Sequence, residues 1–130
     1  MRPYLDKSHP ASWSAARSWS DAVLADAAAA GLTEQEVELI KVRASQLNGC
    51  AYCLDLHSRA ARRAGIPPQK LDLLPAWRET ERYTEREQSV LAVAESATAM
   101  PLSEDAQAEL FGARAVLGDA LFTAAEWVAI

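Results

Sequence analysis

Three segments of this chain carry the pattern that begins an α-helix, and no other feature constrains the fold as much. In residues 33–36, 84–87 and 123–126, a threonine is followed three positions later by a glutamate. In such a capping box, the threonine side chain accepts a backbone N–H of the first turn, and the glutamate reaches back to the threonine N–H. Alternating runs of β-branched and aromatic residues, which indicate strands, are missing, and alanine is abundant. The sequence therefore predicts an all-α fold, a helical bundle.

Glycine and serine residues mark where the expected helices end and begin. Gly31, Gly49 and Gly65 follow stretches of helical periodicity, and a glycine in the left-handed conformation commonly ends a helix. Ser8 or Ser12 is expected to cap the first helix. The expected helices span residues 10–31, 33–48, 50–65, 71–75, 84–100 and 103–117, the last of them beginning at a serine cap.

The end of the chain departs from this pattern. The third capping box predicts a seventh helix that begins at Thr123, but only Trp127 and three further residues follow the box. Because nucleating a helix is costly, a helix this short is not stable alone. Either a partner surface covers this end or the chain is a shortened form of something longer, and helix length favours the second. We therefore expect a shortened C-terminal helix.

Length and composition describe one ordinary domain. The chain has 130 residues, of which 50% are hydrophobic and 24% are charged, so residues 1–130 are expected to form a single soluble domain. The formal net charge of -5 argues against a nucleic-acid partner, because phosphates need a basic face. No segment has the length and hydrophobicity of a membrane span, and no signal-peptide pattern is found. We expect a cytoplasmic protein with no membrane partner, in a compartment that keeps thiols reduced.

Both cysteines and one of the two histidines stand within eight positions, as Cys50, Cys53 and His57. On a helix these positions share one face. Cys50 follows the expected break at Gly49, so it lies at the helix N-terminus, where unpaired N–H groups favour a thiolate. His57 stands one turn after Cys53 and can accept or relay its proton. We therefore interpret Cys53 as the reacting thiolate and Cys50 as the partner that closes a disulfide.

Glu38 is a further candidate, because it lies in the preceding expected helix. A short connection at residues 48–49 would pack the two helices against each other. Glu38 could then contact His57, orient its imidazole and raise its basicity. Taken alone, a carboxylate at this position is more typical of a solvated or paired surface residue.

Three other interpretations of the cysteines stay open. Cys50, Cys53 and His57 could bind zinc, but a structural site usually needs a second ligand pair, and the other histidine, His9, lies near the N-terminus. A thioredoxin-like oxidoreductase would need a strand before the CxxC helix, and the pattern shows none. The third interpretation is a pair of inert buried cysteines. Redox activity is favoured over all three.

The spacing of these residues resembles that of a known family. Glu38, eleven residues, the motif CAYC at 50–53, three residues and His57 resemble the core motif of the AhpD-like alkylhydroperoxidases. These proteins belong to the carboxymuconolactone decarboxylase superfamily. The segments KVRASQLNGCAYCLDLHSRAARRAG (41–65) and AWRETERYTERE (76–87) are similar to its small single-domain members. The resemblance extends over residues 30–100.

The resemblance implies an all-α fold that assembles into homo-oligomers, trimers or hexamers, and a peroxidase that acts on hydrogen peroxide or alkyl hydroperoxides. Cys53 matches the peroxidatic cysteine, which becomes a sulfenic acid. Cys50 matches the partner that protonates the leaving group and then condenses to the disulfide. His57 and Glu38 match the proton relay. No metal, flavin or other cofactor is implied, and an external dithiol reductant or a reductase partner must reduce the disulfide.

Tyr52 departs from the family pattern, because the best-studied members have a histidine before the second cysteine. A tyrosine can donate a hydrogen bond but is a poor base at neutral pH, so Tyr52 is a candidate pocket wall or relay donor. Relatives also usually continue past a segment like FTAAEWVAI (122–130) with a further long helix. The four tryptophans are more typical of core or interface packing than of a substrate site.

Two other functions fit the same residues. A non-catalytic helical oligomer that senses redox state would form the Cys50–Cys53 disulfide once and change its assembly. A decarboxylase of the wider superfamily is disfavoured, because those relatives do not depend on a CxxC couple. The sequence therefore predicts a thiol-dependent peroxidase before either alternative.

Overall fold

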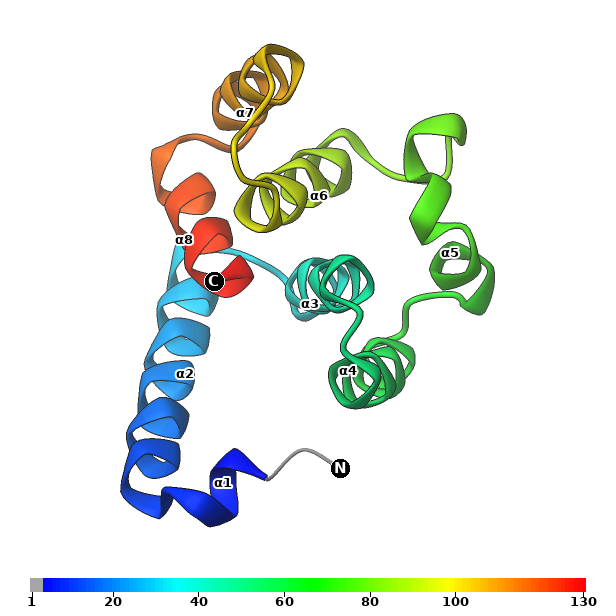
Figure 1. The fold of residues 1–130 in the computed structure, drawn as a ribbon. Helices are drawn as coiled ribbons and strands as arrows, with labels where there is room; N and C mark the ends of the chain where they lie inside the picture. Colours follow the sequence, from blue (N-terminus) through cyan, green and yellow to red (C-terminus); the bar gives the residue numbers. More distant parts are fainter. Residues whose placement is uncertain (1–3) are drawn as a thin grey trace.

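The computed structural model describes residues 4–130, and every regular element within them is a helix (Figure 1). The α-helices are α1 (Leu5–Ser8), α2 (Pro10–Ala30), α3 (Glu34–Asn48), α4 (Ala51–Arg63), α5 (Pro68–Asp72), α6 (Glu85–Thr98), α7 (Glu104–Leu117) and α8 (Asp119–Ala129), and a 3-10 helix, η1, spans Leu74–Glu79. The expected all-α fold is confirmed. In this part of the chain, no helix has both the length and the apolar character needed to cross a lipid bilayer.

Helices α3 and α6 pack together at the centre of the molecule, between two hydrophobic clusters. The first cluster, which includes Ile40 and Val90, fills the space that α2, α7 and α8 share with the central pair. The second, which includes Leu39 and Leu91, fills the space toward α4, α5 and η1. Figure 1 shows α2 and α8 on one side of the central pair and α4 and α5 on the other. Consecutive residues of α3, and likewise of α6, therefore point into different hydrophobic clusters.

Side-chain caps begin three of the helices where the sequence predicts them. Thr33, Thr84 and Ser103 each accept a hydrogen bond of 3.1 Å from the backbone N–H three residues later. These bonds satisfy N–H groups that have no partner inside the helix. The expected starts of α3, α6 and α7 are confirmed.

The third capping box does not begin a helix, and this expectation is wrong. Helix α8 begins at Asp119 with Gly118 as its N-cap, so Thr123 lies inside it. Thr123 Oγ1 donates a 2.8 Å hydrogen bond to the carbonyl of Asp119, one turn earlier. A threonine whose hydroxyl donates to a carbonyl of the preceding turn lies inside the helix and does not act as its N-cap. Helix α8 is therefore 11 residues long rather than a helix too short to be stable alone.

Two other boundaries differ from expectation. Neither Ser8 nor Ser12 caps α2, because His9 is the N-cap residue and makes no side-chain cap bond. Pro10 follows at the first helical position, where its fixed φ and missing N–H cost nothing. The single short helix expected at residues 71–75 is instead two elements, since α5 ends at Asp72 and η1 continues to residue 79.

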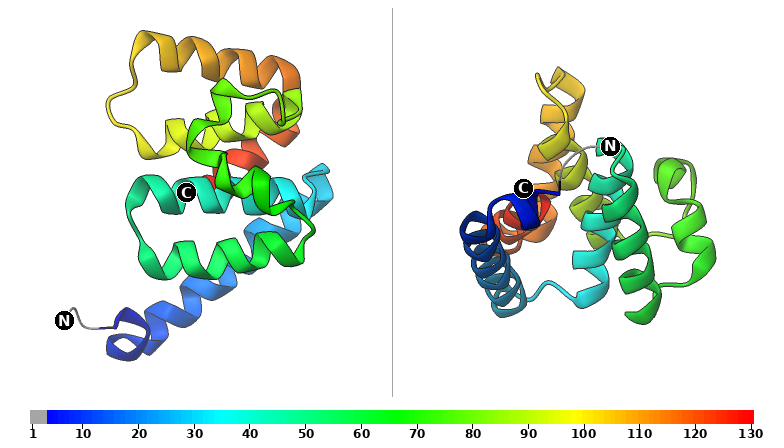
Figure 2. Two further views of the ribbon diagram at one scale, coloured as in Figure 1. Left: turned by 90° about the vertical axis from the view of Figure 1, so that its right-hand side faces the viewer. Right: turned by 60° about the horizontal axis from the view of Figure 1, so that its bottom comes forward.

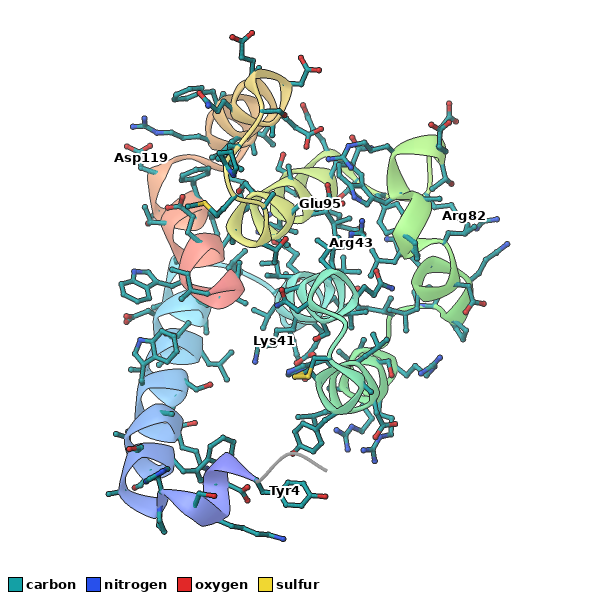
Figure 3. The ribbon with its side chains drawn as sticks, in the orientation of Figure 1. Tyr4, Lys41, Arg43, Arg82, Glu95 and Asp119 are labelled. Atoms are coloured by element: carbon teal, nitrogen blue, oxygen red, sulfur yellow. A yellow bond between two sulfur atoms is a disulfide. The ribbon has the colours of Figure 1, made fainter. Side chains whose placement is uncertain are left out.

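A single carboxylate on α6 joins the elements around the second cluster (Figure 3). Glu95 Oε1 accepts hydrogen bonds of 2.9 Å from Arg43 Nε of α3 and from Trp77 Nε1 of η1. Its Oε2 lies 2.7 Å from Arg78 Nη2, and Arg78 also pairs with Glu109 of α7. Burial alone would raise the pKa of Glu95, but its hydrogen bonds to the three donors together lower it. The carboxylate is therefore charged at neutral pH and connects α6 directly to α3 and η1, and through Arg78 to α7.

We expect Glu95→Gln to lower the free energy of unfolding by about 2 kcal/mol at neutral pH, because the charged acceptor of three donors becomes a neutral amide. The difference from wild type should shrink in acid. A carboxyl whose pKa is lowered by folding stabilises the fold above its unfolded-state pKa, and this contribution is lost as the pH falls through the folded-state pKa. Urea unfolding at neutral pH and at steps below pH 4.5 measures both effects.

Glu109→Gln is the matched control, because it changes the more exposed carboxylate partner of Arg78 and leaves Glu95 in place. It should cost less than about 0.5 kcal/mol, as exposed pairs do. Equal losses in the two variants would contradict the central role of Glu95.

Candidate active site

The CxxC motif stands at a tight connection between α3 and α4, which run side by side in opposite directions (Figure 2). Gly49 adopts the left-handed conformation with φ of 63°. Its N–H donates to the Gln46 carbonyl and the Cys50 N–H donates to the Ser45 carbonyl, both at 3.2 Å. These bonds form the Schellman ending of α3. Cys50 is also the N-cap of α4, because the Cys53 N–H donates to its sulfur at 3.2 Å. One residue therefore ends one helix and begins the next.

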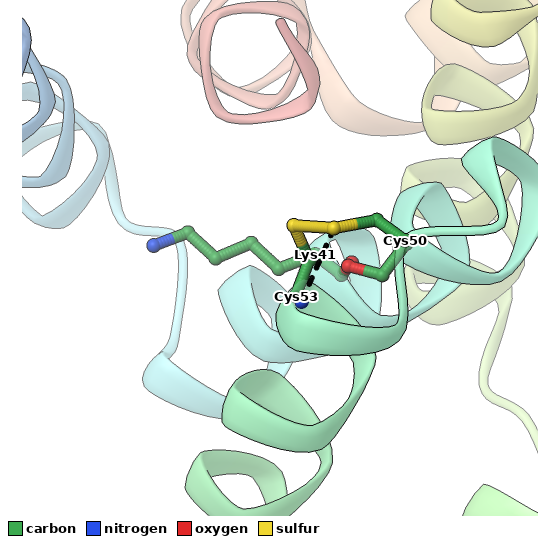
Figure 4. The surroundings of a disulfide bond; sticks show 4 residues. Lys41, Cys50 and Cys53 are labelled. Atoms are coloured by element: carbon green, nitrogen blue, oxygen red, sulfur yellow. Dashed lines mark hydrogen bonds between the residues drawn. A yellow bond between two sulfur atoms is a disulfide. The ribbon is translucent and has the colours of Figure 1, made fainter. Parts of the chain in front are cut away.

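Cys50 and Cys53 form a disulfide at the first turn of α4 (Figure 4). Their Cα atoms are 5.3 Å apart, and both residues are half-buried. The backbone N–H groups at a helix N-terminus favour negative charge, and here one of them is already directed at the Cys50 sulfur. The arrangement suits thiols that must become thiolates.

Glu38 and His57 come together across the α3–α4 pair, as the sequence analysis expects. His57 Nδ1 and Glu38 Oε2 are 3.2 Å apart. Their side chains are 22% and 12% exposed, so the contact is largely shielded from water. A carboxylate only accepts, so the contact fixes the imidazole with its Nδ1–H toward Glu38 and leaves Nε2 for another partner. Glu38 is therefore not the solvated carboxylate that its position alone would indicate.

A cleft of about 700 Å³ contains the disulfide, and α2, α3, α4 and α8 supply its lining. Cys50, Tyr52, Cys53 and His57 all line it, whereas Glu38 does not and supports His57 from the α3 side. The structure thus brings every predicted site residue to one place. His57 lies one turn after Cys53 on α4, in reach of the same part of the cleft.

Tyr52 stands at the rim of this cleft. Its side chain is 73% exposed and makes no hydrogen bond to any residue in the described range. This position suits the pocket wall, the first of the two roles expected for it. A relay role would require a partner that binds in the cleft.

The opposite wall of the cleft was not predicted from the sequence. Trp13 and Trp19 of α2 line it and are 43% and 45% exposed, so neither is buried core packing. Lys41 of α3 lines it as well. The wall exists because α2 packs against α8, where the rings of Trp19 and Trp127 meet edge to face at 6.2 Å. No local pattern contains this contact, so no sequence signal could have placed these residues at the site.

An all-α fold in which a CxxC pair and a Glu–His pair serve one cleft is that of the AhpD-like proteins. The comparison with protein families agrees. Residues 14–96, more than half of the chain, match the carboxymuconolactone decarboxylase family, and the chain belongs to this family.

Two similar proteins extend the comparison. ATU0492 of Agrobacterium tumefaciens is a protein of unknown function that has been suggested to be the antioxidant defence protein AhpD. Its crystal structure superposes with a TM-score of 0.79 at 30% identity, covering 98% of this chain and 85% of that one. The uncharacterized protein YdfG of Bacillus subtilis is 44% identical over 64 residues. That match covers 49% of this chain and 44% of YdfG, so the chain spans less than half the length of this relative.

We expect Gly49→Ala to destabilise the protein by about 1 kcal/mol, because a left-handed φ is unfavourable for any residue with a Cβ. No atom within 4 Å would obstruct the added methyl group, so backbone conformation alone sets this cost. Gly112→Ala is a matched control, because its surroundings are equally open and it lies inside α7 without a positive φ. It should stabilise the protein by roughly 0.5–1 kcal/mol. Urea unfolding of both variants measures the two effects, and equal signs would contradict the role of the left-handed turn.

Proposed function

We propose that the protein is a thiol-dependent peroxidase of the alkylhydroperoxidase type, which reduces hydrogen peroxide or alkyl hydroperoxides. The observation that carries the proposal is the Cys50–Cys53 pair in one cleft with His57, whose imidazole Glu38 holds. Peroxide reduction needs a thiolate, a resolving thiol and a proton carrier, and these residues supply all three. The similarity to ATU0492, with its suggested role in antioxidant defence, adds support.

In the proposed first step, His57 takes the proton of the Cys53 thiol. The Cys53 thiolate then attacks the terminal oxygen of the hydroperoxide, so that an S–O bond forms while the O–O bond breaks. The departing alkoxide takes the proton of the Cys50 thiol and leaves as an alcohol. Cys53 is now a sulfenic acid and Cys50 a thiolate, which the Cys53 N–H stabilises.

In the second step, the Cys50 thiolate attacks the sulfur of the sulfenic acid. The S–S bond forms, and hydroxide leaves and takes the proton that His57 carried, giving water. The peroxide has gained two electrons, and the two cysteines have lost them. An external dithiol returns both electrons and two protons by thiol–disulfide exchange and becomes a disulfide itself.

The same proposal includes assembly into a homo-oligomer, a trimer or a hexamer. Several large apolar side chains are exposed in the single chain, among them Trp127 at 52% and Phe111 at 69%. Exposed apolar surface of this kind is typical of protein–protein contacts. Light scattering on the purified protein tests the subunit number.

We expect Cys53→Ser to abolish peroxide turnover in the presence of excess dithiothreitol, because no other residue forms the sulfenic acid. Cys50→Ser is the matched control, since it keeps the peroxidatic thiol and removes the resolving one. It should form a sulfenic acid that dimedone traps, with one equivalent of peroxide consumed. If dimedone instead traps a sulfenic acid in Cys53→Ser, Cys50 is the peroxidatic cysteine and Cys53 the resolving one.

The same assay separates the alternative functions. A redox sensor forms its disulfide and changes assembly but shows no sustained turnover of peroxide with dithiol. A decarboxylase of the wider superfamily keeps its activity in Cys53→Ser. Absence of turnover by the wild type with every hydroperoxide tested would contradict the peroxidase proposal.

We expect Glu38→Gln to lower kcat/KM for peroxide by roughly tenfold. A neutral amide does not support proton uptake by the His57 imidazole as a carboxylate does. His57→Ala should cost roughly a hundredfold or more, as loss of a general base does. A change of the pH profile in Glu38→Gln distinguishes an electrostatic role from a structural one. An unchanged profile and rate would remove Glu38 from the mechanism.

A further inference from the structure

Lys41 stands out among the basic residues of the described range. Four lysines and arginines are half-buried: Lys41, Arg43, Lys70 and Arg86. The last three each pair with a glutamate of another helix. Lys41 forms no ion pair and no side-chain hydrogen bond with any described residue. Lys41 is therefore a half-buried lysine whose ammonium group has no carboxylate partner in the part of the chain that the structure describes.

The surroundings of Lys41 favour an anion. Lys41 lies one turn after Glu38 on α3, and its side chain extends from beside the disulfide toward α2 (Figure 4). Arg17 of α2 lines the same cleft and is likewise unpaired among the described residues. No aspartate or glutamate side chain of the described residues contributes to the lining. In a protein with a formal net charge of -5, the charged side chains that line this cleft, Lys41 and Arg17, are both positive.

The remaining lining of the cleft is mostly apolar. Trp13 and Trp19 of α2, Leu56 of α4 and Val128 of α8 contribute to it. Its volume of about 700 Å³ is that of a site for a small organic molecule rather than for hydrogen peroxide alone. A ligand that matches it has a hydrocarbon part and one acidic group.

We propose that the cleft binds organic hydroperoxides that carry a carboxylate, and that Lys41, assisted by Arg17, holds this carboxylate. The hydrocarbon part lies along the tryptophans, and the hydroperoxide group reaches the disulfide-forming cysteines. This inference rests on the proposed peroxidase function and adds its substrate class. The chemistry of peroxide reduction itself stays as described for Cys53 and Cys50.

The test compares the hydroperoxide of linoleic acid with that of methyl linoleate, at concentrations below micelle formation and with uncharged dithiothreitol in excess. In Lys41→Met, kcat/KM for the acid should fall about tenfold, the loss expected for one charge-assisted hydrogen bond. The values for the ester and for hydrogen peroxide should stay within about twofold of wild type, since neither has a carboxylate. Lys41→Arg should restore most of the activity toward the acid.

Arg62→Met is the matched control, because it removes an exposed and unpaired cation of α4 that does not line the cleft. It should leave all three rates unchanged. Equal losses for acid, ester and hydrogen peroxide in Lys41→Met would show that Lys41 acts on the thiolate and would overturn the proposal. No loss for the acid would overturn it as well.

A further experiment tests whether Lys41 binds a carboxylate of the reductant rather than one of the hydroperoxide. With hydrogen peroxide as oxidant, rates are compared for dithiothreitol and for dimercaptosuccinate, a dithiol with two carboxylates. An effect of Lys41→Met on dimercaptosuccinate alone, with the acid hydroperoxide unaffected, would assign Lys41 to the reductant and contradict the inference.

Binding can be measured without turnover, because Trp13 and Trp19 line the cleft and report on it by fluorescence. Linoleate should quench this emission in wild type and bind about tenfold more weakly to Lys41→Met. If no hydroperoxide is turned over, the peroxidase function fails, and the linoleate titration still decides the carboxylate site. If turnover depends on Cys53 but acid and ester respond alike to Lys41→Met, only the further inference fails.

Discussion

The site depends on one backbone arrangement, the turn in which Cys50 both closes α3 and opens α4. The Cys50 N–H completes the Schellman ending of α3, and the Cys50 sulfur accepts the Cys53 N–H in the first turn of α4. Gly49 makes this possible, because only a left-handed residue lets the second helix fold back along the first. The turn places the redox pair at a helix N-terminus and brings Glu38 to His57. The placement of the cysteine pair and of the Glu38–His57 pair thus follows from a single connection.

That turn keeps its geometry only if α3 is itself held in place, and α3 is packed between the two hydrophobic clusters. Its neighbouring residues Leu39 and Ile40 are buried in different hydrophobic clusters. Rotation of the helix would expose one cluster or the other. Arg43, on the same helix, is bound to the Glu95 carboxylate of α6. Hydrophobic packing therefore fixes the rotation of α3, and the buried charge fixes its position along α6.

The parts of the fold that the sequence predicts are those that depend on nearby residues. The threonine caps at Thr33 and Thr84 form as expected, because each satisfies an N–H group within its own turn. The glutamates of the two capping boxes pair with Arg86 and Lys70 instead. The same pattern at Thr123 fails, because its hydroxyl bonds back within α8 and the helix has already begun at Asp119. The capping-box pattern can therefore stand either at the start of a helix or in its interior. The choice between them depends on packing against α2 and α6, which the local pattern does not contain.

The two walls of the cleft also differ in whether nearby residues or distant packing determine them. The wall with Cys50, Cys53 and His57 follows from spacing and one short turn, so a sequence can specify it locally. The wall with Trp13 and Trp19 belongs to the first half of α2, where residues 10–22 are all exposed. Helix α2 packs mainly against α8, with Trp19 against Trp127, and has no comparable packing against α3 or α4. Substitutions on α2 can therefore change the shape of the cleft without disturbing the turn that holds the cysteines. The two walls of the cleft can thus vary independently of each other.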